Sequence, residues 1–534
     1  MKFLEHFRSR SRLKEKKKSD ADHAPADLAI RPGADYIARL GEPVLRRIFT
    51  LVCPHTADDS YEPSERSMIG DGCMLCDLRD LSNCARVRRQ WCRPAQELLY
   101  TRIRIDAVHY CELEEILSEK RVRKSILFER NDELIDIPAI RLQLLSRTVR
   151  ESRHLSQLVQ TLKLPYMTRE TQKADLARTL SVLTNIRYVD LPDGFFTGDG
   201  SCITLRQEIQ ARCPGIRKMK YSRGSEYYFE QLVQQHWSML ETLEIERLSL
   251  EPATLRRVLA SLPQLHELAL SDMSWLDDNI FQVVPHMPNF PPLRKFALTG
   301  LPRITAAGLV NYLSRPETRE TFTSLSLSKT GITITELHSV VWAATHLLEL
   351  SVCETVATSL PLEPIKPLTS ITLQTLYFEI TPEVDGRYSH HQPEASYYSY
   401  LSTSLLGNSL PALRTLYVRD TDFAENLTAL APPAPAFAAN AARQGFTQPL
   451  EVYSKGLDEL DWVFTSVSAS ADDSFPGGGG GTGRRSFGST SGGRPISAYS
   501  ASKGLGPQWG GEARRSVVVG NGFGGFLAVP AADA

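Results

Sequence analysis

Four residues in the N-terminal part of the sequence have side chains that could hold a metal ion. They follow the order Cys-x-His, then 17 residues, then Cys-x-x-Cys, and they are Cys53, His55, Cys73 and Cys76. Thiolate and imidazole groups are preferred ligands of zinc, and four of them would fill its tetrahedral shell. The spacing therefore indicates a structural zinc site without an open position for catalysis. Free thiols in a flexible loop are the alternative.

Known catalytic motifs are missing from the sequence. It contains no P-loop, no G-x-S-x-G nucleophile elbow, no H-E-x-x-H helix and no G-x-G-x-x-G between a strand and a helix. The adjacent His390 and His391 have no third ligand nearby, so we interpret them as polar loop residues. We therefore expect a protein that is not an enzyme and that requires no cofactor, apart from the zinc ion that the cysteines could bind.

Length, charge and cysteine content narrow the class of protein. The 534 residues exceed one ordinary core, and the net charge of −1 argues against attraction of the whole protein to nucleic acid or to a membrane. Nine irregularly spaced cysteines without a signal peptide fit reduced thiols in the cytoplasm or nucleus. No stretch of 18 apolar residues occurs, so we expect no transmembrane segment.

The two ends of the chain differ from its middle. Residues 2–18 carry eight Lys or Arg, which would suit a nuclear-import signal, a surface helix on anionic membrane, or a disordered basic segment over residues 1–34. Residues beyond 470 hold 17 of the 33 glycines and few apolar side chains. We therefore expect residues 466–534 to form a disordered Gly/Ser-rich tail.

The middle of the chain repeats one short pattern of three apolar residues at steps of 24 to 30 residues from Val159 to Leu373, and the copy at Leu413 follows after 40 residues. Clear copies span Leu240–Ile245, Leu265–Leu270, Leu293–Leu298, Phe322–Leu327, Leu347–Val352, Leu373–Phe378 and Leu413–Val418, and fainter copies begin at Val159, Ile186, Ile216 and Leu457. Helical spacing between copies, as in residues 255–262, predicts one strand and one helix per unit. Stacked units would bury the apolar faces that single units leave open.

This segment resembles the leucine-rich-repeat family over about residues 155–465. The steps lie close to the family's period of roughly 20–29 residues. The Asn or Cys that usually follows the pattern is replaced by residues such as Leu248 and Thr330, so the resemblance implies an irregular solenoid. Two stretches without the pattern, residues 379–411 and 429–450, are expected to be loops.

Two apolar stripes at helical spacing precede the repeats. They comprise Leu40, Val44, Leu45, Ile48, Phe49 and Val52 in the first, and Leu81, Cys84, Val87 and Trp91 in the second. We expect the second stripe to lie on one helix that begins near Asp80. Arg86, Arg88 and Arg89 then point elsewhere, and we interpret them as a solvated helix face rather than a phosphate-binding strip.

These stripes resemble the F-box family over about residues 36–105, with the Cys/His insertion at 53–77. The family pattern is matched at Leu40, Val44, Leu45, Ile48, Phe49, Leu81, Val87, Arg89, Trp91, Leu99 and Tyr100, whereas Gly41, Pro43 and Arg88 depart from it. An F-box followed by leucine-rich repeats is typical of substrate receptors of cullin-based ubiquitin ligases. The resemblance implies that a Skp-family adaptor, and a cullin through it, docks on Leu40, Val44, Leu45, Ile48, Phe49, Val87 and Trp91.

Two alternatives to this interpretation remain open. The apolar residues could merely close the N-terminal end of the solenoid, or the chain could be a leucine-rich-repeat scaffold without a role in ubiquitin transfer. A third, an enzyme formed by residues 379–411, has no sequence feature in its support.

The sequence as a whole predicts an α/β chain with an F-box-like helical module, an irregular leucine-rich-repeat solenoid and a disordered C-terminal tail. Along each repeat strand, the side chains between the apolar ones would face the concave side and contact a protein target. These candidates are Lys163, Tyr188, Lys218, Lys220, Glu244, Glu267, Lys295, Glu349, Tyr377 and Tyr417. Basic residues early and acidic residues later predict a charge gradient, with the two last tyrosines as anchors. The loop at 379–411 is the alternative target site.

Overall fold

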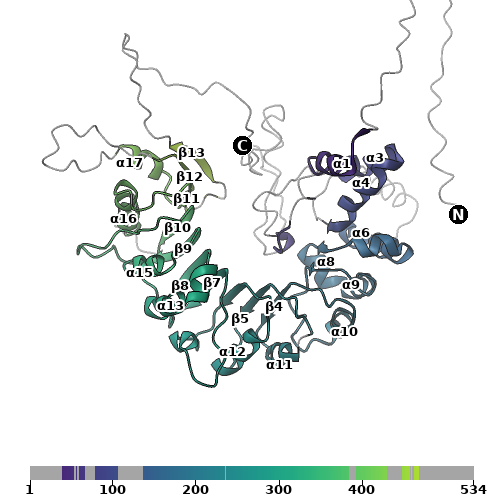
Figure 1. Ribbon diagram of the computed structural model, residues 1–534, viewed down its shortest axis with the longest axis horizontal. Helices are drawn as coiled ribbons and strands as arrows, with labels where there is room; N and C mark the ends of the chain where they lie inside the picture. Colours follow the sequence, from purple (N-terminus) through teal and green to yellow (C-terminus); the bar gives the residue numbers. More distant parts are fainter. Residues whose placement is uncertain are drawn as a thin grey trace, which may run out of the picture.

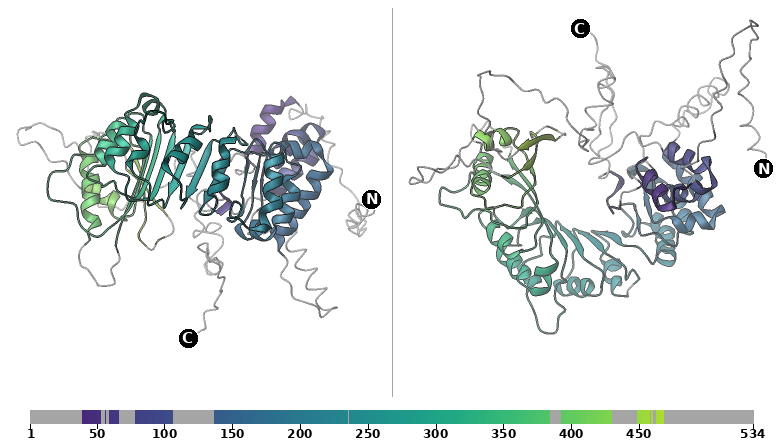
Figure 2. Two further views of the ribbon diagram at one scale, coloured as in Figure 1. Left: turned by 90° about the horizontal axis from the view of Figure 1, so that it is seen from below. Right: turned by 45° about the horizontal axis from the view of Figure 1, so that its top comes forward.

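A computed structural model describes residues 39–52, 56, 59–65, 78–105, 136–234, 236–383, 392–429, 448–457, 459 and 462–467. These residues form an open arc with strands on its concave side and helices on its convex side (Figure 1). The view from below and the tilted view show the same two layers (Figure 2). The predicted α/β architecture with a parallel, solenoid-like sheet is confirmed at this level.

The strands form two sheets. In the smaller one, β1 (Arg102–Arg104), β2 (Thr161–Lys163) and β3 (Tyr188–Val189) are parallel. The larger sheet runs in sequence order from β4 to β13, and all its pairs are parallel except β12 with β13. Its strands are β4 (Lys218–Ser222), β5 (Thr242–Glu246), β6 (Glu267–Ser271), β7 (Lys295–Leu301), β8 (Ser324–Thr330), β9 (Glu349–Val356), β10 (Thr375–Pro382), β11 (Thr415–Val418), β12 (Leu450–Ser454) and β13 (Val463–Val467).

The repeat pattern locates most strands closely. Each strand from β2 to β11 begins two residues after the first apolar residue of its copy. The copy expected at Leu457 is wrong, because that residue is exposed between β12 and β13. Strand register places the inward apolar residues in one buried column, which comprises Leu243, Leu268, Phe296, Leu325, Leu350, Leu376, Leu416 and Val452.

Helices cover the convex side of the sheets. They are α6 (Ile137–Glu151), α7 (Arg153–Leu158), α8 (Tyr166–Thr171), α9 (Lys173–Leu180), α10 (Ile203–Arg212), α11 (Glu226–Glu230), α12 (Pro252–Ala260), α13 (Ala306–Leu313), α14 (Pro316–Thr321), α15 (Leu337–Ala343), α16 (Glu394–Leu406) and α17 (Phe423–Ala429). Short 3-10 turns occur at Gly200–Cys202, Gln231–Gln234 and Asp278–Phe281. The connection from β9 to β10 contains no helix. Among the described residues, no helix is long and apolar enough to cross a membrane.

The expected loop at 379–411 is largely regular structure. Strand β10 continues to Pro382, and helix α16 begins at Glu394. The buried Tyr398 hydroxyl donates to the Ile380 carbonyl (2.9 Å) and accepts from the Arg419 amide (3.1 Å), so α16 is fixed to β10 and β11. The sequence suggested a loop because this stretch is polar and aromatic without an apolar period. In the structure, tyrosines of α16 occupy its buried positions. Residues 384–391, and 430–447 of the second expected loop, lie outside the described residues.

A separate helical module lies at the N-terminal end of the arc. It consists of α1 (Glu42–Thr50), α3 (Leu78–Val87) and α4 (Arg89–Thr101), and α4 leads directly into β1. Because β1 pairs with β2, the module is joined to the arc through a strand of the first sheet. The expected basic segment at 1–34 and nearly all of the expected tail at 466–534 lie outside the described residues.

Candidate protein-interaction surfaces

The three helices of the N-terminal module enclose a small core of their own. Its buried residues are Leu45, Phe49, Leu81, Ala95 and Leu98. The half-buried Trp91 meets the Phe49 ring edge-on, with centroids 5.4 Å apart. Leu45 and Phe49 are only 1% and 2% exposed, which corrects the expectation that they contact an adaptor directly. They hold the module together instead.

The second apolar stripe is divided between two helices. Arg88 has an extended backbone (φ −155°, ψ 147°), so α3 ends at Val87 and α4 starts at Arg89. The prediction of one continuous helix from Asp80 is therefore wrong. The break leaves Val87 66% exposed at the end of α3, while Arg86 and Arg89 are solvated as expected.

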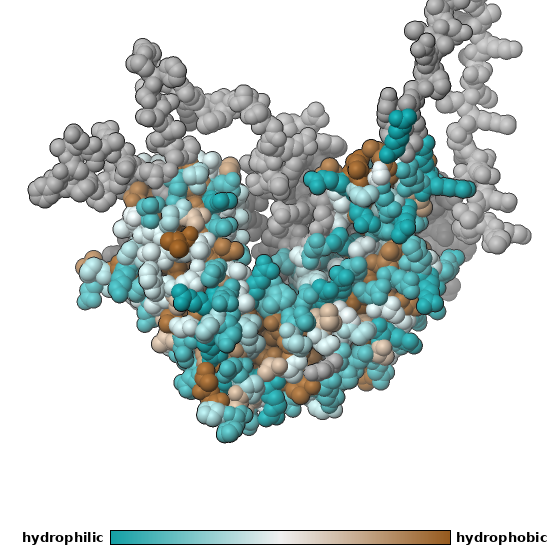
Figure 3. All heavy atoms as spheres, in the orientation of Figure 1, coloured by the Kyte–Doolittle hydropathy of each residue, from teal (hydrophilic) through white to brown (hydrophobic). Residues whose placement is uncertain are grey.

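One apolar face of the module remains open to solvent. Val44 and Ile48 are 49% and 43% exposed, and Leu51 and Val52 continue this face beyond the end of α1. Figure 3 shows an apolar patch at the end of the arc that carries α1. Contiguous exposed apolar residues on a folded unit commonly mark a binding surface for another protein. We call Val44, Ile48, Leu51 and Val52 the α1 face.

Residues 59–65 form a strap over the concave side of the first sheet. The Ser60 hydroxyl lies 3.2 Å from Lys163 Nζ, and Glu65 pairs with Arg169 at 2.8 Å. The Tyr61 ring stacks on Tyr188 with centroids 5.8 Å apart. Lys163 and Tyr188 are consequently 3% and 5% exposed, which corrects the expectation that they face an open surface.

Asp190 fixes the end of the strap. Its carboxylate accepts hydrogen bonds from the backbone amides of Ser64 (3.2 Å) and Leu164 (2.9 Å), and from the Tyr188 hydroxyl (2.6 Å). Burial raises the pKa of the Asp190 carboxyl, while these donors act in the opposite direction. The strap thus joins the α1–α3 connection to the solenoid through a buried polar cluster.

Removal of the Tyr61 ring should loosen this strap. Tyr61→Ala deletes the stacking on Tyr188, and we expect a loss of about 1 kcal/mol, which corresponds to roughly fivefold faster hydrogen exchange over residues 59–65. Tyr61→Phe keeps the ring and should leave exchange near the wild-type rate. Equal exchange in wild type and Tyr61→Ala, measured by mass spectrometry, would show that the stacking does not hold the strap.

The concave face of the larger sheet carries a central row of outward side chains in register. From β4 to β12 this row comprises Lys220, Glu244, Ala269, Ala297, Ser326, Ser351, Tyr377, Tyr417 and Tyr453. The middle of the row is a floor of small side chains, and its C-terminal end is a step of three tyrosines. The concave face therefore changes from small to aromatic side chains between β9 and β10.

The tyrosines of this row are stacked on one another. Tyr377 and Tyr417 lie 4.2 Å apart at an interplanar angle of 7°, and Tyr417 and Tyr453 lie 4.7 Å apart at 14°. Trp462 meets Tyr417 edge-on at 5.2 Å. Burial raises the pKa of the Tyr377 phenol, with a further contribution from Glu349, so the ring stays uncharged at neutral pH. We call Tyr377, Tyr417 and Tyr453 the tyrosine ladder.

Ion pairs neutralise much of the predicted charge gradient. Lys218 pairs with Glu244 (2.5 Å) and Lys220 with Glu246 (2.9 Å). Lys295 pairs with Glu267 (3.3 Å). Each pair joins neighbouring strands, so the two charges cancel locally instead of adding along the arc. The aromatic step, rather than a gradient, is the distinctive feature of the concave face.

The candidate zinc ligands Cys53, His55, Cys73 and Cys76 lie outside the described residues, as do His390 and His391. Within the described part of the chain, no group of three or more His, Cys, Asp or Glu could hold a metal ion. The zinc site therefore stays a prediction.

Sequence reasoning missed three features of these surfaces. Tyr453 and Trp462 were not expected because the last strands were misplaced, and the strap has no periodic signal. Trp342, on helix α15, was not expected at the surface although it is strongly exposed.

The sequence matches no protein-family model and no curated protein. A chain in the crystal structure of the Rad7 and Elc1 complex in yeast is similar to this chain with a TM-score of 0.36 and 12% sequence identity, over 65% of this chain and 92% of that chain. A TM-score this low does not assign a function.

Proposed function

We propose that this chain is the substrate-recognition subunit of a cullin-type ubiquitin ligase. In this proposal the α1 face docks a Skp-family adaptor, and the concave sheet holds a protein target. The observation that carries the proposal is the apolar α1 face, which stays exposed although the three helices already possess a core.

The position of the α1 face favours docking over capping. Helix α4 packs on α7 and leads into β1, so the module closes the end of the arc through α4 and the first sheet. Val44 and Ile48 are not used in that contact and remain in water. Exposed apolar surface of this kind gains free energy when a partner covers it.

The concave face supplies the second half of the proposal. Aromatic rings dominate the energy of many protein interfaces, and the tyrosine ladder presents such rings next to a floor of small residues. The receptor itself would perform no covalent chemistry. It would raise the effective concentration of target lysines near a conjugating enzyme to about the millimolar range for a flexible tether.

Co-purification of a Skp-type adaptor with the full chain tests this function. Deletion of residues 36–105 would also remove the strap and β1, both of which contact the first sheet. Substitutions confined to the α1 face are therefore the cleaner test. Capture of a target without any adaptor would favour a scaffold without a role in ubiquitin transfer.

We also propose that Cys53, His55, Cys73 and Cys76 bind one structural zinc ion. Purified protein should then carry about one zinc per chain by elemental analysis, and Cys73→Ser with Cys76→Ser should remove it. Cys92→Ser with Cys353→Ser is the matched control, because these two thiols lie outside the Cys/His insertion and are half-buried and exposed, respectively. Metal-free wild type purified without chelator would contradict the site.

A further inference from the structure

The helical layer on the convex side has a gap beside α15. Every other connection between neighbouring strands from β7 to β12 carries a helix, but residues 357–374 between β9 and β10 carry none. Three prolines at 361, 364 and 367 explain this, because each removes a backbone donor and disfavours helix in the residue before it. One side of α15 is therefore not covered by a helix from the next strand connection.

Helix α16 holds this helix-free connection in place. Tyr400 donates to the Lys366 carbonyl (2.9 Å), and Tyr397 donates to the Thr358 carbonyl (3.1 Å). The hydroxyl of Ser404 accepts from the Leu368 amide (3.1 Å). The far wall of the gap is thus fixed by side chains of the next unit, and the gap is a preformed groove.

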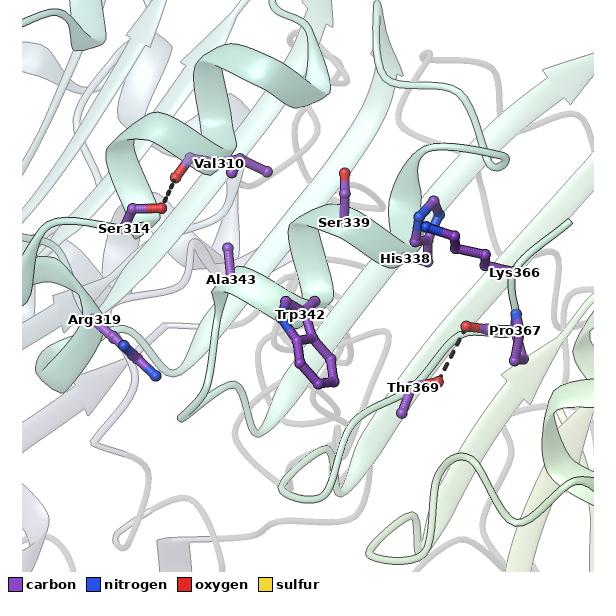
Figure 4. Close-up of a pocket in the computed structure, with 10 residues that line it drawn as sticks. All are labelled: Val310, Ser314, Arg319, His338, Ser339, Trp342, Ala343, Lys366, Pro367 and Thr369. Carbon is purple, nitrogen blue, oxygen red and sulfur yellow. Dashed lines mark hydrogen bonds between the residues drawn. The ribbon is translucent and has the colours of Figure 1, made fainter.

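Trp342 stands in the middle of this groove. Trp342 is 74% exposed. Figure 4 shows its indole between Arg319 on one side and Lys366, Pro367 and Thr369 on the other. The cavity has a volume of about 680 Å³. It is lined by Val310, Ser314, Arg319, His338, Ser339, Trp342, Ala343, Lys366, Pro367 and Thr369.

The charged side chains that line the groove are all positive. Its lining contains Arg319 and Lys366 but no Asp or Glu. Arg319 donates through Nε to the Thr345 hydroxyl (3.1 Å), and neither its terminal nitrogens nor Lys366 Nζ has an acceptor among the described residues. The lysines of the concave face differ, because they are paired with glutamates. Two uncompensated cations beside an exposed indole suit an anionic partner with an apolar side chain.

We propose that the Trp342 groove is a second docking site, which binds a short acidic segment of a partner protein through one large apolar side chain. The apolar side chain would pack on the indole, and the carboxylates would pair with Arg319 and Lys366. A protein segment is favoured over nucleic acid because the chain's net charge of −1 provides no general attraction for a polyanion. This site is independent of the α1 face and of the concave sheet.

Selection from a displayed library of random 12-residue peptides tests the groove. The full chain serves as bait, and the Trp342→Ala variant serves for counter-selection. We expect this variant to fold normally because the Trp342 side chain is exposed. We expect enriched peptides with net negative charge and at least one large aliphatic or aromatic residue. Failure to enrich any peptide over Trp342→Ala, or enrichment of basic or uncharged peptides, would overturn the proposal.

Variants then measure each contribution to binding of the enriched peptide by fluorescence anisotropy. Trp342→Ala should weaken binding by about tenfold or more, as expected for an aromatic anchor, and Trp342→Phe should restore most of it. Arg319→Glu with Lys366→Glu should abolish binding. Arg257→Glu on α12, an outer helix three strand connections before α15, is the control charge reversal and should have no effect. Tighter binding of single-stranded oligouridylate than of the acidic peptide would assign the groove to nucleic acid and overturn the proposal.

Discussion

Val44→Asp with Ile48→Asp is expected to abolish recovery of a Skp-type adaptor while the chain stays folded. Both residues are about half exposed on α1, so their replacement should change the stability of the module by less than about 1 kcal/mol. Two carboxylates in a dry interface would each cost several kcal/mol, which predicts at least a ~100-fold loss of affinity. Affinity purification of the full chain, with the adaptor quantified by mass spectrometry, measures the effect.

The matched control for this pair is Val233→Asp with Met239→Asp. These two residues are 41% and 43% exposed and lie in the solenoid, so they introduce the same charge at similar exposure away from α1. Adaptor recovery should be unchanged in the control. Wild-type recovery in a folded Val44→Asp/Ile48→Asp variant would refute the assignment of the α1 face.

The burial of Leu45 and Phe49 decides which substitutions are informative. Phe49→Ala would remove a ring that contacts Trp91, and such core truncations typically cost about 3–5 kcal/mol. Loss of adaptor binding in a Leu45→Asp/Phe49→Asp variant would therefore reflect unfolding of the module. Only the exposed members of the α1 stripe separate docking from folding.

Sequence periodicity located the strands but not the orientation of α1. The apolar positions of a parallel repeat strand face one core, so three residues per unit suffice to place β2 to β11. Helix α1 is apolar on two adjoining sides, which contain Leu45 and Phe49 on one and Val44 and Ile48 on the other. A period of 3.6 residues identifies both sides and does not say which side a second helix covers.

Long-range contacts account for the other differences. The strap lies about a hundred positions before the residues that it covers, such as Lys163, and its six polar or aromatic residues have no repeating spacing. Strand alternation correctly assigned Lys163 and Tyr188 to the concave side of β2 and β3. Only the fold shows that another segment already occupies that side.

The cancelled charge gradient has a related cause. Lys218 and Glu244 are two positions apart in register on neighbouring strands, and a long lysine side chain reaches this diagonal distance. The pairing depends on register, which follows from the repeat only after the units are aligned. The same alignment adds Tyr453 to Tyr377 and Tyr417.

Removal of two rings from the tyrosine ladder is expected to be the most damaging change for target capture. Tyr377→Ala with Tyr417→Ala eliminates the 4.2 Å stack and removes the ring on which Tyr453 stacks. Loss of an aromatic anchor typically costs at least 2 kcal/mol, so we expect capture of the target to fall by about 30-fold or more. Quantitative pull-down of the protein that co-purifies with the wild-type chain measures the loss, and adaptor recovery should remain unchanged.

Two further variants distinguish the ladder from the neighbouring segment and from a general loss of structure. Tyr377→Phe with Tyr417→Phe keeps both rings, so it should retain most of the capture because the stacking faces persist. Deletion of residues 383–399 would remove the start of α16, including the buried Tyr397 and Tyr398, and would confuse binding with folding. Replacement of residues 384–391 by a Gly/Ser linker of equal length avoids this problem. If the linker variant loses the target and the double alanine variant keeps it, the target binds the segment before α16, because the rings of the ladder then contribute nothing to capture.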